Sequence, residues 1–148
     1  MDKPDDAMAA YCAFLAALSP ETLGSLDVFC SPEVRFRDPF NDVTGVAPFR
    51  AILKKAFDDL HEPRFAVLHH GCAGQVGYMR WDFTFQGRRG PRLIAGMSEI
   101  RFDDALKVAV HFDYWDPSQI YASVPLLGMA VRLVRRRLGL PAASERGR

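Results

Sequence analysis

A strict alternation of apolar and polar side chains between residues 79 and 85 constrains the fold more than any other feature. One parity carries Met79, Trp81, Phe83 and Phe85, and the other carries Arg80, Asp82 and Thr84. Successive side chains of a β-strand point to opposite faces of its sheet. The segment therefore predicts a strand in a sheet that has one apolar, concave side and one polar side.

The rest of the chain completes an α+β pattern around this strand. We expect a meander of strands at 64–70, 76–85, 93–102 and 107–115, with turn residues at 71–74 and 86–90. Apolar residues recur at helical spacing over 7–18 and 48–60. A Ser-Pro pair at 19–20 predicts the start of a second short helix that runs to about residue 29. A short strand at 34–37 and a turn-rich loop at 38–42 follow it.

Composition fits one domain with an ordinary core. The 148 residues are 49% hydrophobic, and the formal net charge of +1 leaves no basic field that would recruit nucleic acid. The three cysteines lie far apart, which argues against a disulfide framework and against a zinc site. The acidic N-terminus has no apolar signal segment, and no apolar run reaches the ~20 residues of a membrane span. We therefore expect a cytoplasmic protein with a domain at 1–117, an amphipathic helix at 118–138 and a loose tail at 139–148.

Four short motifs follow one another along the chain in an order that is informative about the fold. They are the loop Arg37-Asp38-Pro39-Phe40, a third helix initiated at Gly45, the strand Ile100-Arg101-Phe102-Asp103 and the strand His111-Phe112-Asp113-Tyr114-Trp115. Together they resemble the NTF2-like superfamily and, within it, the SnoaL-like and ketosteroid isomerase-like group. The resemblance covers roughly residues 5 to 116. It implies a cystatin-like fold, in which a cone-shaped, mostly antiparallel sheet and three N-terminal helices enclose a pocket for a hydrophobic small molecule.

Asp38 is the first candidate catalytic residue. The resemblance places it in the loop that holds the catalytic base of ketosteroid isomerase, where a carboxylate removes a proton next to a carbonyl group. The alternative is that an Asp before Pro closes a turn by accepting backbone N–H bonds.

His111 and Asp113 are the second set of candidate catalytic residues. They are two residues apart on a predicted strand, so they share a face with each other and with Trp115. The resemblance turns this Trp toward the pocket, and SnoaL-like cyclases use a pocket Asp and His as acid and base. Because an unpartnered buried carboxylate is costly, the pair is expected either to serve a ligand or to fix the register of the sheet as a polar pair.

Two positions depart from ketosteroid isomerase, which stabilises its oxyanion with a Tyr and a protonated Asp. By gapless counting these positions fall on Phe14 and Ser98. Phe cannot donate a hydrogen bond, and the loss of one oxyanion donor costs about 10²–10³ in rate. Tyr11, one helical turn before Phe14, and Ser98 itself are the alternative donors. The full set of expected substrate-binding residues is Tyr11, Phe14, Phe40, Trp81, Phe83, Ser98 and Trp115.

These residues support three functional hypotheses. The first is a cofactor-free acid–base isomerase or cyclase that acts on a hydrophobic carbonyl compound of steroid, polyketide or lipid type. The second is a binding protein that holds such a ligand without changing it. The third is an interaction module that forms a homodimer through the outer sheet face, with Arg80, Asp82, Glu99 and Arg101 pairing across the joint. The sequence has no Gly-rich phosphate loop, so no cofactor is expected, and no metal either.

The segment at 118–138 combines an apolar stripe with Arg132, Arg135, Arg136 and Arg137. Cations suit the C-terminal end of a helix dipole, so a plain surface helix docked on the domain is one interpretation. The others are a lid over the pocket and a basic amphipathic face that rests on anionic lipid.

Overall fold

The computed structural model describes residues 3–122 and 125–140. The chain divides into two compact units, Met1–Trp115 and Asp116–Arg148. The first unit contains, in order, α1 (Pro4–Ala16), the 3₁₀ turn η1 (Leu23–Ser25), α2 (Leu26–Phe29), β1 (Cys30–Arg37), β2 (Asp42–Thr44), α3 (Val46–Asp59), β3 (His61–Ala73), β4 (Val76–Gly87), β5 (Gly90–Phe102) and β6 (Val108–Trp115).

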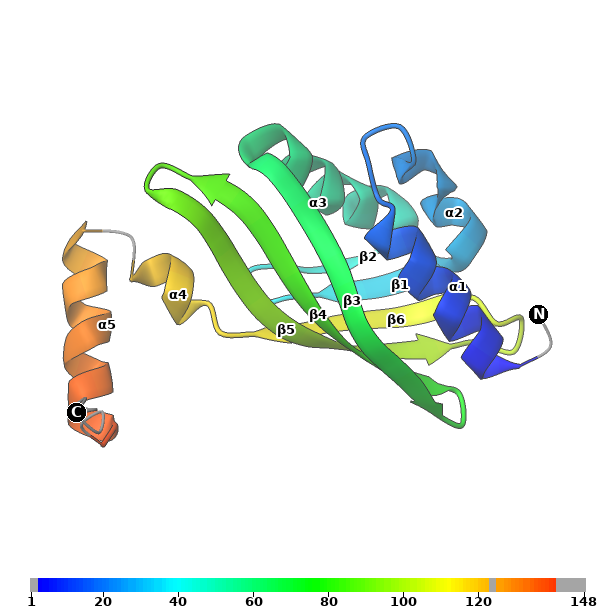
Figure 1. The fold of residues 1–148 in the computed structure, drawn as a ribbon. Coiled ribbons are helices and arrows are strands. Elements are labelled where there is room, and N and C mark those ends of the chain that lie inside the picture. Colours follow the sequence, from blue (N-terminus) through cyan, green and yellow to red (C-terminus); the bar gives the residue numbers. More distant parts are fainter. Residues whose placement is uncertain (1–2, 123–124, 141–148) are drawn as a thin grey trace, which may run out of the picture. The chain divides into compact units, whose positions relative to one another are not determined.

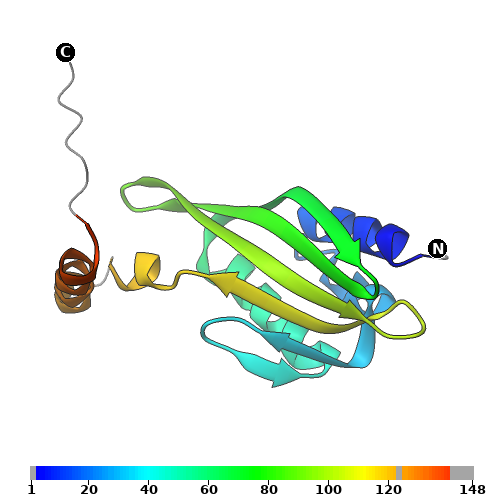
Figure 2. The same ribbon diagram turned by 90° about the horizontal axis from the view of Figure 1, so that it is seen from below.

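In the described residues the strands form one six-stranded sheet in the order β2-β1-β6-β5-β4-β3. Neighbouring strands are antiparallel, except for the parallel pair β1 and β6. The helices α1, α2 and α3 lie on one face of the curved sheet (Figure 1), and none of these three lies on the opposite face in the view from below (Figure 2). The α+β architecture with a mostly antiparallel sheet and N-terminal helices, predicted from the sequence, is confirmed.

The alternation of side chains in β4 shows on which side of the sheet the core lies. Met79 and Trp81 are buried on the helix side of the sheet, whereas Tyr78 on the other parity is exposed. On that same side, α1 inserts Met8 and Tyr11, both fully buried. We call the face opposite α1, α2 and α3 the outer face.

Three local expectations were wrong. The Ser-Pro pair does not start a helix, because the Thr22 hydroxyl accepts the Ser19 N–H at 2.8 Å and holds the chain in a turn, and helical structure begins only at η1. The turn expected at 71–74 is shorter: β3 continues to Ala73, and Gly74, at φ +62°, leads the turn. The loop expected at 38–42 ends in β2, which pairs with β1.

The third helix begins at Val46, two residues before the start expected from its apolar spacing and directly after Gly45, as the resemblance implied. Its N-cap is Gly45 at φ +106°, a conformation that favours glycine because it has no Cβ. Pro48 therefore lies inside the first turn, where the missing N–H is not needed.

The second unit contains α4 (Ser118–Tyr121) and α5 (Pro125–Leu138) in place of the single helix expected at 118–138. Pro125 occupies the first position of α5, which suits a residue that lacks a backbone N–H. Most of the predicted tail, residues 141–148, lies outside the described residues. Within the described ranges, no helix has both the length and the apolar character needed to cross a membrane.

Candidate functional site

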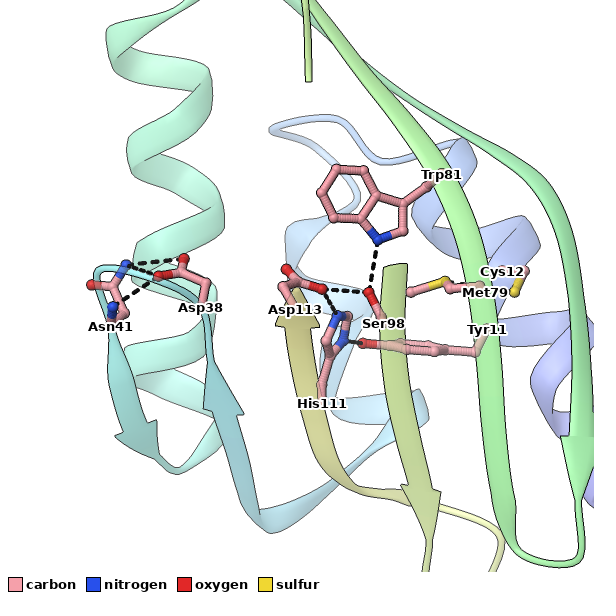
Figure 3. Close-up of polar contacts among 9 residues, drawn as sticks. All are labelled: Tyr11, Cys12, Asp38, Asn41, Met79, Trp81, Ser98, His111 and Asp113. Atoms are coloured by element: carbon pink, nitrogen blue, oxygen red, sulfur yellow. Dashed lines mark hydrogen bonds and ion pairs between the residues drawn. The ribbon is translucent and has the colours of Figure 1, made fainter. Parts of the chain in front are cut away.

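A chain of hydrogen bonds joins α1 to three strands on the helix side of the sheet (Figure 3). Tyr11 Oη lies 2.8 Å from His111 Nδ1, and His111 Nε2 lies 2.8 Å from Asp113 Oδ1. Trp81 Nε1 lies 2.8 Å from Ser98 Oγ, and Ser98 Oγ is hydrogen-bonded to Asp113 Oδ1. We call these five residues the Asp113 network.

Strand register brings the network together. Ser98 of β5 and Asp113 of β6 are directly opposed, and Trp81 of β4 stands opposite Gly96. A Cβ at Gly96 would lie 2.4 Å from the Trp81 ring. The absence of a side chain at Gly96 thus lets the indole cross β5 and reach Ser98.

The direction of each hydrogen bond follows from the chemistry of the groups. An indole N–H can only donate, so Ser98 Oγ accepts from Trp81 and directs its own hydrogen to Asp113. At the other end, burial raises the pKa of Tyr11 well above its ordinary value of 10.0, so the phenol keeps its proton. With the phenol donating to Nδ1, we assign the ring hydrogen of His111 to Nε2, which donates to Asp113. Both branches therefore end on Oδ1 of Asp113, and Oδ2 remains outside the network.

Aromatic rings surround the histidine. The rings of Tyr11, Phe36 and Phe49 contact His111 edge-on, with centroid distances of 5.7, 5.3 and 5.4 Å. The side chain of His111 is 4% exposed and that of Asp113 is 18% exposed. The carboxylate is consequently the more accessible member of the pair.

A cavity of about 90 Å³ adjoins this pair. His111 and Asp113 are its polar lining residues, and the remainder of the lining is apolar: Leu15, Leu18, Phe36, Leu53, Ala56, Phe57, Pro63, Phe65 and Phe83. The volume is well below the roughly 300–1,000 Å³ of a pocket for a drug-sized ligand. In this conformation the cavity suits a small apolar molecule, and a ligand of steroid size would require the lining to open.

Asp38 lies apart from the Asp113 network. Its position follows Arg37, which pairs with Phe112, so its backbone comes level with Asp113 on the neighbouring strand. Its carboxylate, however, turns toward Asn41 (Figure 3) and closes a turn. Oδ1 accepts the backbone N–H groups of Phe40 and Asn41 at 2.7 and 2.8 Å and the Asn41 side-chain amide at 3.0 Å. Asp38 therefore has the turn-forming arrangement that the sequence left open as the alternative, and it is not among the residues that line this cavity.

The other predicted binding residues divide into two groups. Phe83 lines the cavity, and Trp81 and Ser98 belong to the network beside it. Phe14 instead stacks on Tyr11 and Phe29, at centroid distances of 6.3 and 4.5 Å. Phe40 is 50% exposed and contacts Trp115 edge-on at 5.4 Å, so these two rings pair with each other outside the cavity lining.

Sequence reasoning missed the walls contributed by α1, α3 and β3. Leu15, Leu53 and Phe65 line the cavity. The helical spacing of Leu53 and its neighbours indicated an apolar face, but nothing local distinguished a cavity wall from solid core. The described residues also contain no group of three or more His, Cys, Asp or Glu side chains that could hold a metal ion.

Comparison with protein families gives one match. Residues 11–111, more than half of the chain, match the SnoaL-like domain. No curated protein matches the chain.

Solved structures with the same fold share little sequence with this chain. An NTF2-like protein of unknown function from Burkholderia pseudomallei K96243 is 14% identical, with a TM-score of 0.69 over 80% of this chain and 97% of its own. A candidate SnoaL-like polyketide cyclase from Shewanella putrefaciens CN-32 is 19% identical, with a TM-score of 0.65 over 78% and 93%. An LEH-like epoxide hydrolase from M. tuberculosis is 17% identical, with a TM-score of 0.64 over 86% and 95%. At these identities the likeness extends to the fold alone.

Proposed function

Because this chain belongs to the SnoaL-like domain family, we propose that it is a cofactor-free acid–base enzyme, an isomerase or cyclase, for a small hydrophobic carbonyl compound. One observation carries the proposal: Asp113 is the one carboxylate in the lining of an apolar cavity, and two buried donors hold a single one of its oxygens. A carboxylate oriented in this way can act as a positioned proton acceptor.

The proposed reaction begins at Oδ2 of Asp113. This oxygen takes a proton from the carbon next to the carbonyl group, and the electron pair of the broken C–H bond moves into the carbonyl to give an enolate. In an isomerase, Asp113 returns the proton to another carbon of the conjugated system. In a cyclase, the enolate carbon bonds to a second carbonyl carbon, and the proton goes to the new alkoxide oxygen.

The rest of the network has positioning roles in this proposal. Ser98 and His111 fix Oδ1, and Tyr11 fixes the His111 ring. The hydrogens of Tyr11 and Ser98 are both committed within the network, so neither residue is assigned as an oxyanion donor. Asp38, engaged in its turn, is not assigned as the base.

Isomerisation of cyclohex-3-enone to its conjugated isomer, followed by ultraviolet absorbance, tests the proposal with a probe of suitable size. We expect Asp113→Asn to lower the rate by about 10²–10⁴, the usual contribution of general acid–base catalysis. Asp104→Asn, an exposed turn residue, is the matched control and should keep the wild-type rate. A fully folded Asp113→Asn variant with the wild-type rate would refute the role of Asp113.

Ligand binding without turnover is the second candidate, and the committed hydrogens of Tyr11 and Ser98 favour it. Native mass spectrometry of the purified protein separates the two. A ligand that co-purifies unchanged and is lost in Ala56→Phe, which fills the cavity, supports binding alone. A carbonyl compound that is released as an isomer or cyclised product supports catalysis.

A further inference from the structure

Within the second unit, the apolar side of α5 is strongly exposed. Six of its large apolar residues are exposed, from 44% at Leu127 to 84% at Leu138, while Val131 is partly buried. Leu126, Leu133 and Val134 are spaced i, i+7 and i+8, which places them on one stripe of the helix. The second unit thus carries an apolar stripe on a helix of 14 residues.

Within this unit, α4 approaches a different side of α5. A Cβ at Gly128 would lie 2.4 Å from the carbonyl oxygen of Ala122, which follows α4. Arg135, seven residues after Gly128 and therefore almost two full turns on, is hydrogen-bonded to Ser118 and lies 3.4 Å from Asp116. The Gly128–Arg135 side is accordingly the one that meets α4, and the stripe with Leu133 points well away from it.

The charge of α5 has a single sign. The helix contains four arginines and no acidic residue, although the whole chain has a formal net charge of only +1. Arg132, Arg135 and Arg136 are spaced i, i+3 and i+4, so they share one face opposite the apolar stripe. Arg137, four residues after Leu133 and three after Val134, falls within the stripe at its C-terminal end, where a long side chain can extend its charge toward a polar surface.

We infer that α5 binds anionic lipid bilayers, lying in the plane of the surface with its apolar stripe among the acyl chains and its arginines among the phosphates. A short helix with a strongly cationic face and an opposite apolar face has the physical properties of an interfacial helix. Arg135 is paired with Asp116, so anionic headgroups would supply the charge complementarity for the other three arginines, which have no acidic residue on their own helix. At 14 residues the helix is too short to span the bilayer, which leaves the surface orientation.

Vesicle flotation of the full chain tests this inference. We expect binding to vesicles of equal phosphatidylcholine and phosphatidylglycerol, weak binding to phosphatidylcholine alone, and release by high salt. Leu133→Asp removes the apolar contact, and Arg132→Glu with Arg136→Glu reverses two charges; each variant should lower the partition coefficient by about tenfold or more. Arg88→Glu with Arg89→Glu, in the exposed β4–β5 turn, is the control with the same change in charge, and Val28→Asp on α2 is the apolar control.

The outcomes separate membrane binding from other uses of the helix. Retained circular dichroism together with lost flotation in both α5 variants, and normal flotation in both controls, supports the inference. Equal binding by the wild type and the α5 variants overturns it. A wild-type protein that does not float with anionic vesicles overturns it as well. Light scattering without lipid that shows oligomers dissolved by Leu133→Asp would also overturn it, because the stripe would then be a protein–protein contact.

Discussion

At the scale of single residues, the properties of Asp113 follow from the groups that hold its Oδ1. Trp81 can only donate, and this fixes the direction of the Ser98 hydrogen bond. Burial keeps Tyr11 protonated, and this fixes the direction of the His111 branch. Asp38 comes from the neighbouring strand at the same level, yet nearby N–H groups hold its carboxylate in a turn. Local hydrogen bonds, more than position in the fold, distinguish the two carboxylates.

Buried thiols make a residue-scale prediction about alkaline stability. Burial raises the pKa of Cys12 to about 11 and that of Cys30 to about 12, from an ordinary value of 9.0. Above about pH 9 the thiols of the unfolded chain lose protons while those of the folded protein keep them, so the free energy of unfolding falls as pH rises. Cys30→Ala should flatten this decline in urea titrations at a series of alkaline pH values. Cys72→Ala, a half-buried site, should flatten it less, and parallel curves for wild type and Cys30→Ala would contradict the account.

At the scale of elements, the crossing of β5 by the Trp81 indole gives the second prediction. Gly96→Ala would place a methyl group 2.4 Å from the ring, so the ring must move and its hydrogen bond to Ser98 must break. We expect a loss of about 1–3 kcal/mol in the free energy of unfolding, the usual cost of overpacking, with a shift in tryptophan fluorescence. Gly71→Ala, where a Cβ meets nothing within 4 Å, is the control. Equal stability of the two variants would show that the indole has room.

The elements also show how far the sequence reaches. Alternation within one strand was sufficient to predict the apolar face of β4, and parity placed His111 and Asp113 on one face of β6. The pairing of Ser98 with Asp113 depends on the register between two strands, and the Tyr11–His111 contact joins residues 100 positions apart. Neither the pairing nor the contact can be recognised from the residues next to each position in the sequence. For Asp38, the sequence contained both interpretations, and the hydrogen bonds that its carboxylate accepts from the backbone N–H groups of Phe40 and Asn41 decide between them.

At the scale of the whole molecule, the predicted homodimer through the outer face stays a prediction. The expected cross-dimer charges pair within the chain instead, since Arg101 lies 2.6 Å from Glu99 and Arg80 lies 3.3 Å from Asp82. The side chains of this face that could contact a second copy are instead apolar. They are Tyr78, Leu93, Met97 and Tyr114, each about half exposed. Met97→Glu should therefore convert a dimer to a monomer in light scattering, whereas Val28→Glu on α2 should not. A monomeric wild type would contradict the prediction.

The central claim is that Asp113 is the functional carboxylate of the cavity and that Asp38 is a structural one. A side-by-side measurement of cyclohex-3-enone isomerisation by Asp113→Asn and Asp38→Asn tests it most directly, with thermal unfolding of each variant as the check on folding. We predict that Asp113→Asn loses about 10²–10⁴ in rate at near wild-type stability, while Asp38→Asn keeps most of the rate and loses stability through its weakened turn. The reverse pattern, a rate that depends on Asp38 and survives the loss of Asp113, would contradict the account.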